Sequence, residues 1–229
     1  MRSCRNLRYL IRIRIGTGCS NMEIKLNRAD VVILASAHNP SILSPQWLKE
    51  KDLIAEEPEN FINTPDFSLF ESRAFSLIVD RQRLQINTKK QDLDTIESLK
   101  RIGAGYLRLL PHIPYIAIGL NLVWVLEKNV GEELPKIDVE IGGAGNLSGI
   151  LSDHKLSYGC IVNAIRSPYI LKLNVEPQGG NILIYSFNYH HETTGRSVEE
   201  LIKYVENLTN LYENSYKIVK DIVSAGEMK

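Results

Sequence analysis

Alternating hydrophobic and polar positions, followed by a run with helical spacing, occur twice along the chain. The first copy lies around Phe75–Leu110, and the second, which is larger, lies around Tyr169–Ser224. Alternation with a period of two predicts a half-buried strand, whereas apolar residues at every third or fourth position predict an amphipathic helix. Each copy therefore predicts a β-hairpin followed by a helix.

In the first copy, the hairpin alternates on both sides of a short turn at residues 80–82. Its buried face comprises Phe75, Leu77, Val79, Leu84, Ile86 and Thr88. Asp92 or Asp94 caps the helix that follows, and Gly103 and Gly105 inside it predict close packing against another backbone. The apolar stripe of this helix comprises Leu93, Ile96, Leu99, Ile102, Tyr106 and Leu109.

In the second copy, aliphatic and aromatic side chains share one face of a longer hairpin, whose turn lies at residues 178–181. That face comprises Tyr169, Leu171, Leu173, Val175, Leu183, Tyr185, Phe187 and Tyr189. A capping box from Ser197 to Glu200 begins a helix that we expect to continue without a break to Ile222. Its apolar stripe predicts packing on the sheet, and pairing with a second protomer is the alternative.

The most apolar strand, Ile116–Leu126, lies between the two copies. Both of its faces are nearly apolar, which predicts a central strand that is covered on both sides. The other predicted elements are a first strand at Ile24–Ala35, a short helix opened by Ser44 and Pro45, a loop through Pro58 and Pro65, and strands at Lys136–Ile141 and Leu156–Ala164.

Together these elements predict an α+β fold with two related halves. Each half is an antiparallel sheet with a helix packed on one face, and the long central strand joins the halves. The first half is expected to span residues 22–130, and the second half, with the long C-terminal helix, residues 131–229. Residues 1–21 are expected to be a basic extension that is disordered or precedes the true start at Met22.

The charge of the chain is unevenly distributed. Residues 1–21 hold five arginines and no acidic residue, so the remainder carries 22 basic against 27 acidic side chains and a net charge of −5. A body of that charge disfavours nucleic-acid binding unless the N-terminal arginines supply it. The composition of this segment also fits a transit peptide, whereas Arg12 and Arg14 interrupt the apolar stretch that a secretory signal needs.

Hydrophobicity and cysteine content bear on whether the protein enters a membrane, forms disulfides or binds a metal. No apolar stretch approaches the roughly 20 residues that cross a bilayer, which predicts that the protein does not associate with membranes. Cys4, Cys19 and Cys160 fit neither a disulfide framework nor a zinc site. We therefore expect no metal, no cofactor and a cytoplasmic location.

The sequence His190-His191-Glu192 is the sole cluster of catalytic residue types. Neighbours along a strand point to opposite faces, so His190 and Glu192 can share a cleft, with the carboxylate orienting the imidazole as general base. No nucleophile and no paired cysteines accompany them at a diagnostic spacing. The alternative is a solvated strand end without a catalytic role.

Three further residues are candidates for binding. His38 and Asn39 follow the first strand, where side chains can gather in a cleft, and His191 lies beside the catalytic candidates. Asn39 and Pro40 also form a typical turn sequence, so a purely structural role is the alternative. The glycine-rich run at residues 142–149 lacks the spacing of a phosphate-binding loop and predicts a flexible connection.

The order of elements resembles that of a sporadically distributed, functionally uncharacterised family of prokaryotic proteins. The likeness is carried by the first strand, the first hairpin and helix, the central strand at Tyr115–Leu122, and the second hairpin with the helix at Leu201–Ile222. It covers most of residues 22–229 and implies no activity.

Three hypotheses for function follow. The first is a non-enzymatic interaction or assembly protein, whose partner is another protein or a second copy of the chain. The second is a small hydrolase-like enzyme that uses His190 and Glu192. The third is binding to nucleic acid or an acidic surface through the N-terminal arginines. A small-molecule ligand is not specified by the sequence.

Overall fold

The computed structural model describes residues 11–14, 23–127, 136–139, 159–178 and 181–225. The glycine-rich run at residues 142–149 lies outside the described residues, and so does the N-terminal segment apart from Ile11–Arg14. Within the described part of the chain, no helix combines the length and the apolar character that crossing a bilayer requires.

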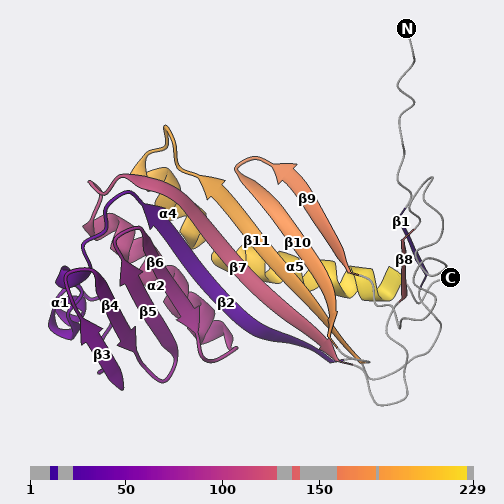
Figure 1. Cartoon of the computed structure of the whole chain (residues 1–229), viewed down its shortest axis with the longest axis horizontal. Helices are drawn as coiled ribbons and strands as arrows, with labels where there is room; N and C mark the ends of the chain where they lie inside the picture. Colours follow the sequence, from indigo (N-terminus) through magenta and orange to yellow (C-terminus); the bar gives the residue numbers. More distant parts are fainter. Residues whose placement is uncertain (1–10, 15–22, 128–135, 140–158, 179–180, 226–229) are drawn as a thin grey trace, which may run out of the picture.

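An antiparallel sheet of nine strands forms the body of the molecule (Figure 1). The strands lie side by side in the order β3-β4-β5-β6-β2-β7-β11-β10-β9, and each neighbouring pair is antiparallel. Their bounds are β2 (Glu23–Ala35), β3 (Asn60–Asn63), β4 (Phe67–Glu71), β5 (Phe75–Asp80), β6 (Arg83–Thr88), β7 (Tyr115–Glu127), β9 (Cys160–Arg166), β10 (Tyr169–Gln178) and β11 (Ile182–Glu192).

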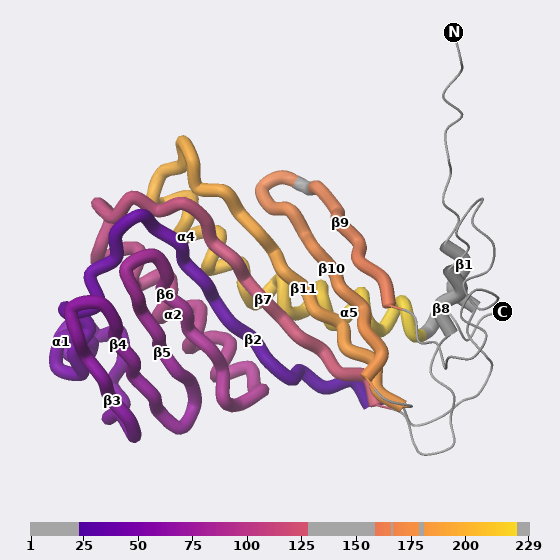
Figure 2. Tube along the Cα trace, viewed as in Figure 1, coloured from indigo at the N-terminus to yellow at the C-terminus, as the bar shows by residue number. Residues whose placement is uncertain are grey.

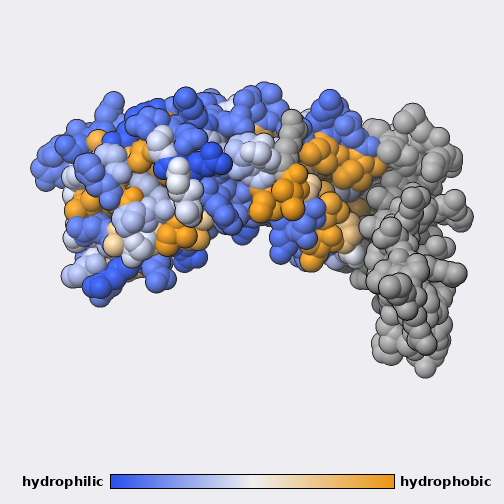
Figure 3. Space-filling model, turned by 90° about the horizontal axis from the view of Figure 1, so that it is seen from above, coloured by the Kyte–Doolittle hydropathy of each residue, from blue (hydrophilic) through white to orange (hydrophobic). Residues whose placement is uncertain are grey.

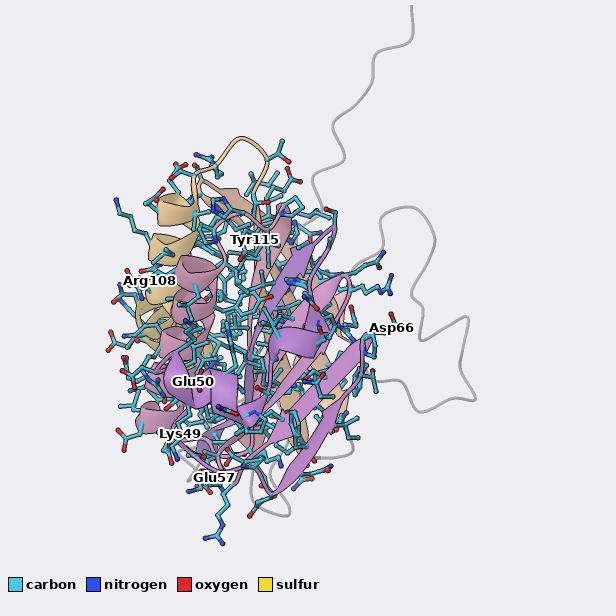
Figure 4. All side chains as sticks on the ribbon, turned by 90° about the vertical axis from the view of Figure 1, so that its left-hand side faces the viewer. Lys49, Glu50, Glu57, Asp66, Arg108 and Tyr115 are labelled. Carbon is cyan, nitrogen blue, oxygen red and sulfur yellow. The ribbon has the colours of Figure 1, made fainter. Side chains whose placement is uncertain are left out.

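Helices α2 (Leu93–Leu109), α4 (Val198–Glu206) and α5 (Leu208–Ala225) cover one face of this sheet. The end-on view shows the two layers, with Arg108 on the helix side and Asp66 on the strand side (Figure 4). The 3₁₀ turn η1 (Pro40–Ile42) and helix α1 (Pro45–Glu50) lie beside β3 and β4. Among the described residues, no helix lies on the opposite face, which we call the open face.

Helices α2 and α4 begin at the caps that the sequence predicts. Asp92 Oδ1 accepts a hydrogen bond from the Thr95 backbone N–H at 2.8 Å, and Ser197 forms a complete capping box with Glu200. A capping side chain satisfies backbone donors that have no partner inside the helix, and it stabilises a helix by about 1 kcal/mol. The starts of these two helices are therefore encoded locally.

Strand β7 is central, as its apolar sequence predicts. It pairs with β2 along one edge and with β11 along the other, and Figure 2 shows these long strands side by side. The strands of both predicted halves consequently belong to one continuous sheet. The described helices lie on one face of β7 only, yet Ala117 and Val123 on its other face are also buried.

The hydrophobic core lies between the sheet and the helices. Leu120 and Leu122 of β7 are fully buried, and Trp124 is 2% exposed. The Trp124 indole packs against the rings of Tyr212 and Tyr216 on α5, and its Nε1–H donates to Ser215 Oγ at 2.8 Å. The apolar stripe of the C-terminal segment therefore packs on the sheet.

Two predicted segments differ from the structure. The predicted loop between Pro58 and Pro65 contains β3, and β4 follows directly after it. Strands of four and five residues are too short to show a clear alternation. The nearby prolines also favour a loop over a strand in a reading of the sequence. The predicted strand at Lys136–Ile141 appears as β8 (Lys136–Val139), which pairs with β1 (Ile11–Arg14) in a separate two-stranded sheet.

The prediction of one unbroken C-terminal helix is also wrong. Asn207 separates α4 from α5, and its side-chain Oδ1 accepts a hydrogen bond from Asn210 Nδ2 at 2.7 Å. Asparagine lowers helix propensity because its short side chain bonds to groups nearby, which favours a break at this position. The break lets α4 follow α2, where Glu206 pairs with Arg108, while α5 packs beneath Trp124.

Glycines inside α2 mark close packing, as expected, but the neighbours are side chains. A Cβ on Gly103 would lie 3.1 Å from Val205 Cγ1 of α4, and one on Gly105 would lie 2.5 Å from Leu53 Cδ2. Both distances are shorter than an ordinary van der Waals contact between carbon atoms. These two positions let α2 approach α4 and the segment after α1.

Candidate functional site

A row of polar side chains crosses the open face through all nine strands. The pairing registers place one polar residue from each strand directly beside the next, from one edge of the sheet to the other. We call this set the polar row, and in spatial order it comprises Asn60, Glu71, Ser76, Asn87, Asp30, Asn121, Asn188, Lys172 and Asn163.

The centre of the polar row is a hydrogen-bonded chain across three strands. Asn121 Nδ2 donates to Asp30 Oδ1 at 2.6 Å, and Asn188 Nδ2 donates to Asn121 Oδ1. Arg28 Nε lies 3.3 Å from Asp30 Oδ2, so each oxygen of the carboxylate has a polar partner. The chain holds a charged group and two amides in fixed orientations, because each one is bonded to the next.

Asp30 is the most unusual member of the polar row. Its side chain is 2% exposed, although it lies on the face without a described helix. Burial raises the pKa of this carboxyl, and the Asn121 hydrogen bond and the Arg28 charge oppose that rise in part. A buried carboxylate with a raised pKa and a specific charged partner is typical of functional sites, and structural ion pairs show the same signature.

Exposed apolar side chains flank the polar row at both ends of the open face. Ile62 and Phe67 lie on β3 and β4, and Ile165 and Ile170 lie on β9 and β10, where Ile165 is 86% exposed. A surface that combines exposed apolar groups with oriented amides can bind a ligand by burial and hydrogen bonding together.

The predicted dyad lies on this same face. His190 pairs in register with Gly119 and Glu192 with Ala117, so both side chains point to the open face, whereas His191 points to the helices. This division between the two faces was predicted from the alternation. Among the described side chains, no hydrogen bond or ion pair joins His190 to Glu192.

His191 is a core residue. Its ring stacks on Tyr204 of α4 at a centroid distance of 4.3 Å, and its Nδ1–H donates to the Pro168 carbonyl. Its Nε2 is buried and has no hydrogen-bond partner in the described part of the chain. His191 therefore lies on the opposite face from His190 and Glu192. It packs beside aromatic side chains on the helix face.

His38 and Asn39 both hold local structure. The His38 Nε2–H donates to the Ile33 carbonyl at 3.1 Å, and Nδ1 accepts from the Tyr106 hydroxyl at 2.9 Å. This assignment gives a neutral ring, in agreement with the pKa of His38, which burial lowers. Asn39 caps η1 by accepting from the Ser41 backbone N–H. None of these hydrogen bonds involves a member of the polar row.

Metal-ligating residues do not cluster within the described residues. No group of three or more His, Cys, Asp or Glu side chains lies close enough there to hold an ion. Cys160, a free thiol, is half-buried, and burial raises the pKa of the thiol. The described part of the chain thus holds no assembled metal-binding cluster.

The sequence alone did not reveal Asp30, Asn121 or Asn188. Asn121 interrupts the most apolar strand and Asp30 directly precedes the apolar run Val31–Leu34, so each is locally conspicuous. Their alignment depends on strand pairs that are 91 and 67 residues apart in the chain. Local patterns carry no information about those registers.

Models of known protein families give no match to this chain, and a search of curated proteins finds no similar sequence.

Proposed function

We propose that the protein is a non-enzymatic interaction protein of a prokaryotic cytoplasm, and that the open face of its sheet binds a protein partner. The observation that carries this proposal is the polar row, which is flanked by exposed apolar side chains. An antiparallel sheet with one uncovered face carries polar side chains on that face, and here one polar residue from each of the nine strands lies in a single row. The layout resemblance to uncharacterised prokaryotic proteins is part of this proposal and supplies no activity.

The composition of the open face favours a protein as its ligand. Asparagine amides both donate and accept hydrogen bonds, which suits the peptide groups and polar side chains of another protein. The charges of Asp30 and Glu71 are balanced by Lys172 and Arg28, so the face has no basic stripe for a phosphate backbone. Apolar groups such as Ile170 supply the burial that protein interfaces use.

Open-face substitutions test this proposal. The partner is first captured from source cells with the wild-type protein, then purified, and its dissociation constant is measured by calorimetry. Ile170→Asp and Lys172→Glu are each expected to weaken binding by about tenfold or more, as loss of an interface contact does. Leu93→Asp is the matched control, because Leu93 is 54% exposed on α2, in the helix layer.

The outcomes separate binding through the open face from other modes. If Leu93→Asp weakens binding as much as Ile170→Asp does, the partner does not recognise the open face. If no purified protein binds the wild type at a concentration of about 100 μM, the proposal fails. Circular dichroism of each variant verifies that the fold is retained.

A second candidate function is a small hydrolase-like enzyme that uses His190 and Glu192. The observation in its favour is that the strand registers direct both side chains to the same face. It predicts that His190→Ala and Glu192→Ala each abolish the biological activity of the folded protein. The non-enzymatic proposal predicts that a purified partner still binds both variants and that the activity persists.

A third candidate assigns nucleic-acid or acidic-surface binding to the N-terminal arginines. Replacing the five arginines of residues 1–21 by alanine in the full chain would then remove binding that weakens steeply with salt. Binding that is independent of salt, or unchanged in this variant, would exclude it.

We also propose that the two halves of the sheet arose by duplication. In each half a long strand is followed by a hairpin whose second strand pairs with that long strand, and a helix comes next. This sequence is β2, β5–β6 and α2 in the first half, and β7, β10–β11 and α4 in the second. Detectable similarity between the halves in homologous sequences would support the duplication, and separate matches of the halves to unrelated families would oppose it.

A further inference from the structure

Strand β9 leaves one edge of the sheet open. It pairs with β10 over seven residues without a register shift, and no described strand pairs with its outer edge. Its backbone therefore presents a row of N–H and C=O groups that another strand can bind. Ile161, Val162 and Ile165 are 60%, 42% and 86% exposed.

The opposite edge of the sheet is protected. Strand β3 has four residues, lies between Pro58 and Pro65, and is tied to η1 by a hydrogen bond from Asn63 Nδ2 to the Ser41 carbonyl. Short strands, nearby prolines and covering loops are the usual means of blocking edge pairing. Residues 160–165 of β9 contain no charge, no proline and no bulge. Figure 3 shows apolar side chains gathered over the end of the sheet that β9 and β10 form.

We propose that β9 pairs with β9 of a second copy of this chain, antiparallel and about a two-fold axis through Asn163. This interface is separate from the open face that the proposed function assigns to a partner. The two sheets then join edge to edge into one continuous sheet.

The sequence of β9 is self-complementary about Asn163. In an antiparallel pair centred there, Ile161 lies opposite Ile165 of the partner subunit, and Asn163 lies opposite the partner's Asn163. On the other face, Val162 lies opposite the partner's Ala164. From Ile161 to Ile165, apolar groups thus meet apolar groups and amides meet amides, which suits an isologous interface, while Cys160 at the strand end lies opposite the partner's Arg166.

The same axis also joins the polar rows of the two copies. Asn163 ends the polar row at this edge, so the row continues through the partner's Asn163 into the second sheet. Lys172 and the partner's Lys172 are then three strand spacings apart, roughly 14 Å, which is beyond the screening length at physiological salt. No like charges oppose one another at the axis.

The contact is small, and this sets its expected strength. A seven-residue strand pair buries about 1,000 Å² in total, at the low end of specific interfaces. We therefore expect a dissociation constant on the order of micromolar, with monomer and dimer in exchange. Sedimentation velocity between about 1 and 300 μM is expected to show a rising dimer fraction.

Cysteine crosslinking tests the register directly in the full chain. In a background with Cys4→Ser, Cys19→Ser and Cys160→Ser, the variant Asn163→Cys is expected to form a disulfide-linked dimer under mild oxidation. Ile161→Cys is the matched control on the same strand and face. Alone it is not expected to crosslink, because its two copies lie about four residues apart, roughly 13 Å, which exceeds disulfide geometry.

Mixing two variants sharpens the test. Ile161→Cys and Ile165→Cys, each monomeric alone, are expected to crosslink when they are mixed, because these positions oppose each other across the axis. In the wild-type background, Asn163→Lys is expected to raise the dissociation constant about tenfold by placing two like charges face to face. A thermal melt of each variant verifies that the sheet remains folded.

Three results would overturn the proposal. One is a strict monomer at about 300 μM, as expected if another segment of the same chain covers β9. Another is equal crosslinking of Asn163→Cys and Ile161→Cys, which would indicate random collision. The last is a dimer whose dissociation constant is unchanged by Asn163→Lys, which would place the interface elsewhere.

Discussion

The two faces of β7 follow different rules although they belong to one strand. On the helix face, Leu120, Leu122 and Trp124 are buried among apolar side chains of the sheet and of α5. On the open face, Asn121 lies between Asp30 and Asn188 in a bonded chain of polar groups. On the helix face, other apolar residues of similar volume could form an equally well-packed core. On the open face, the hydrogen bonds require these particular residues in this particular register.

Stability and the proposed recognition therefore depend on different faces of this fold. Apolar burial on the helix face contributes free energy roughly in proportion to area and is tolerant of the residue type. Hydrogen bonds on the open face add little net stability, since water offers equivalent bonds in the unfolded chain. Burial of Asp30 costs free energy, which its contacts with Asn121 and Arg28 offset only in part.

The largest difference in the free energy of unfolding is expected between alanine substitutions of a leucine on the helix face and of a leucine on the open face. Leu122→Ala on the helix face should lower the free energy of unfolding by about 3 kcal/mol, because it leaves a cavity in a fully buried site. Leu69→Ala on the open face, where the side chain is half-buried, should cost about 1 kcal/mol. Urea unfolding of both variants measures the difference, and equal losses would mean that the open face is packed as a second core.

A smaller effect is expected at the polar contact inside the helix face. Ser215→Ala removes the acceptor for the Trp124 indole N–H and should cost about 1–3 kcal/mol, because a buried donor loses its partner. In the background Trp124→Phe, the same substitution should cost clearly less. A double-mutant cycle by urea unfolding measures this coupling, and a coupling energy near zero would show that the bond is unimportant.

The smallest effect on stability is expected at Asp30, where its sign depends on pH. Burial raises the pKa of Asp30 in the folded state above its ordinary value of 3.8, so the folded protein holds this proton more tightly than the unfolded chain does. The stabilising contribution is therefore complete below that ordinary value and is lost as the pH rises through the folded-state pKa.

Asp30→Asn removes this titration and retains an oxygen that accepts from Asn121. Relative to this variant, the wild type should be most stable in acid and lose that advantage towards neutral pH, where the two should agree within about 1 kcal/mol because the Arg28 partner is 59% exposed and water screens its charge. Urea unfolding from pH 3 to pH 8 measures the difference. A wild-type advantage that grows as the pH rises would show that the Arg28 pair outweighs burial.

Most elements of the fold could be predicted from local pattern. The alternation of Phe75–Val79 gave the first hairpin, and Asp92 and Ser197 marked the helix starts, because these signals act between residues close in sequence. The break at Asn207 was missed, since a continuous apolar stripe conceals a single residue that competes for the backbone. Strands β3 and β4 were missed because they are too short for a period to show.

The candidate site was less predictable than the fold. Alternation correctly divided His190 and Glu192 from His191, since that division needs only the strand geometry. The polar row needs the registers of eight strand pairs, and those are set by packing across the whole sheet. The sequence predicts His38 as a candidate binding residue. Both of its ring nitrogens form hydrogen bonds, one with the Ile33 carbonyl and one with the Tyr106 hydroxyl, and only the tertiary structure reveals these partners.

The position of β7 between β2 and β11 also governs the order in which the chain can fold. Asp30 and Asn121 are 91 residues apart, and Asn121 and Asn188 are 67 residues apart, so the two edges of β7 are filled by long-range closures that form slowly compared with the hairpins. During synthesis, β7 emerges when β2 is already available and β11 is not. The polar row is complete only after the hairpin of β10 and β11 has paired with β7. A partner that contacts the whole polar row would therefore bind the folded protein and not the incompletely synthesised chain.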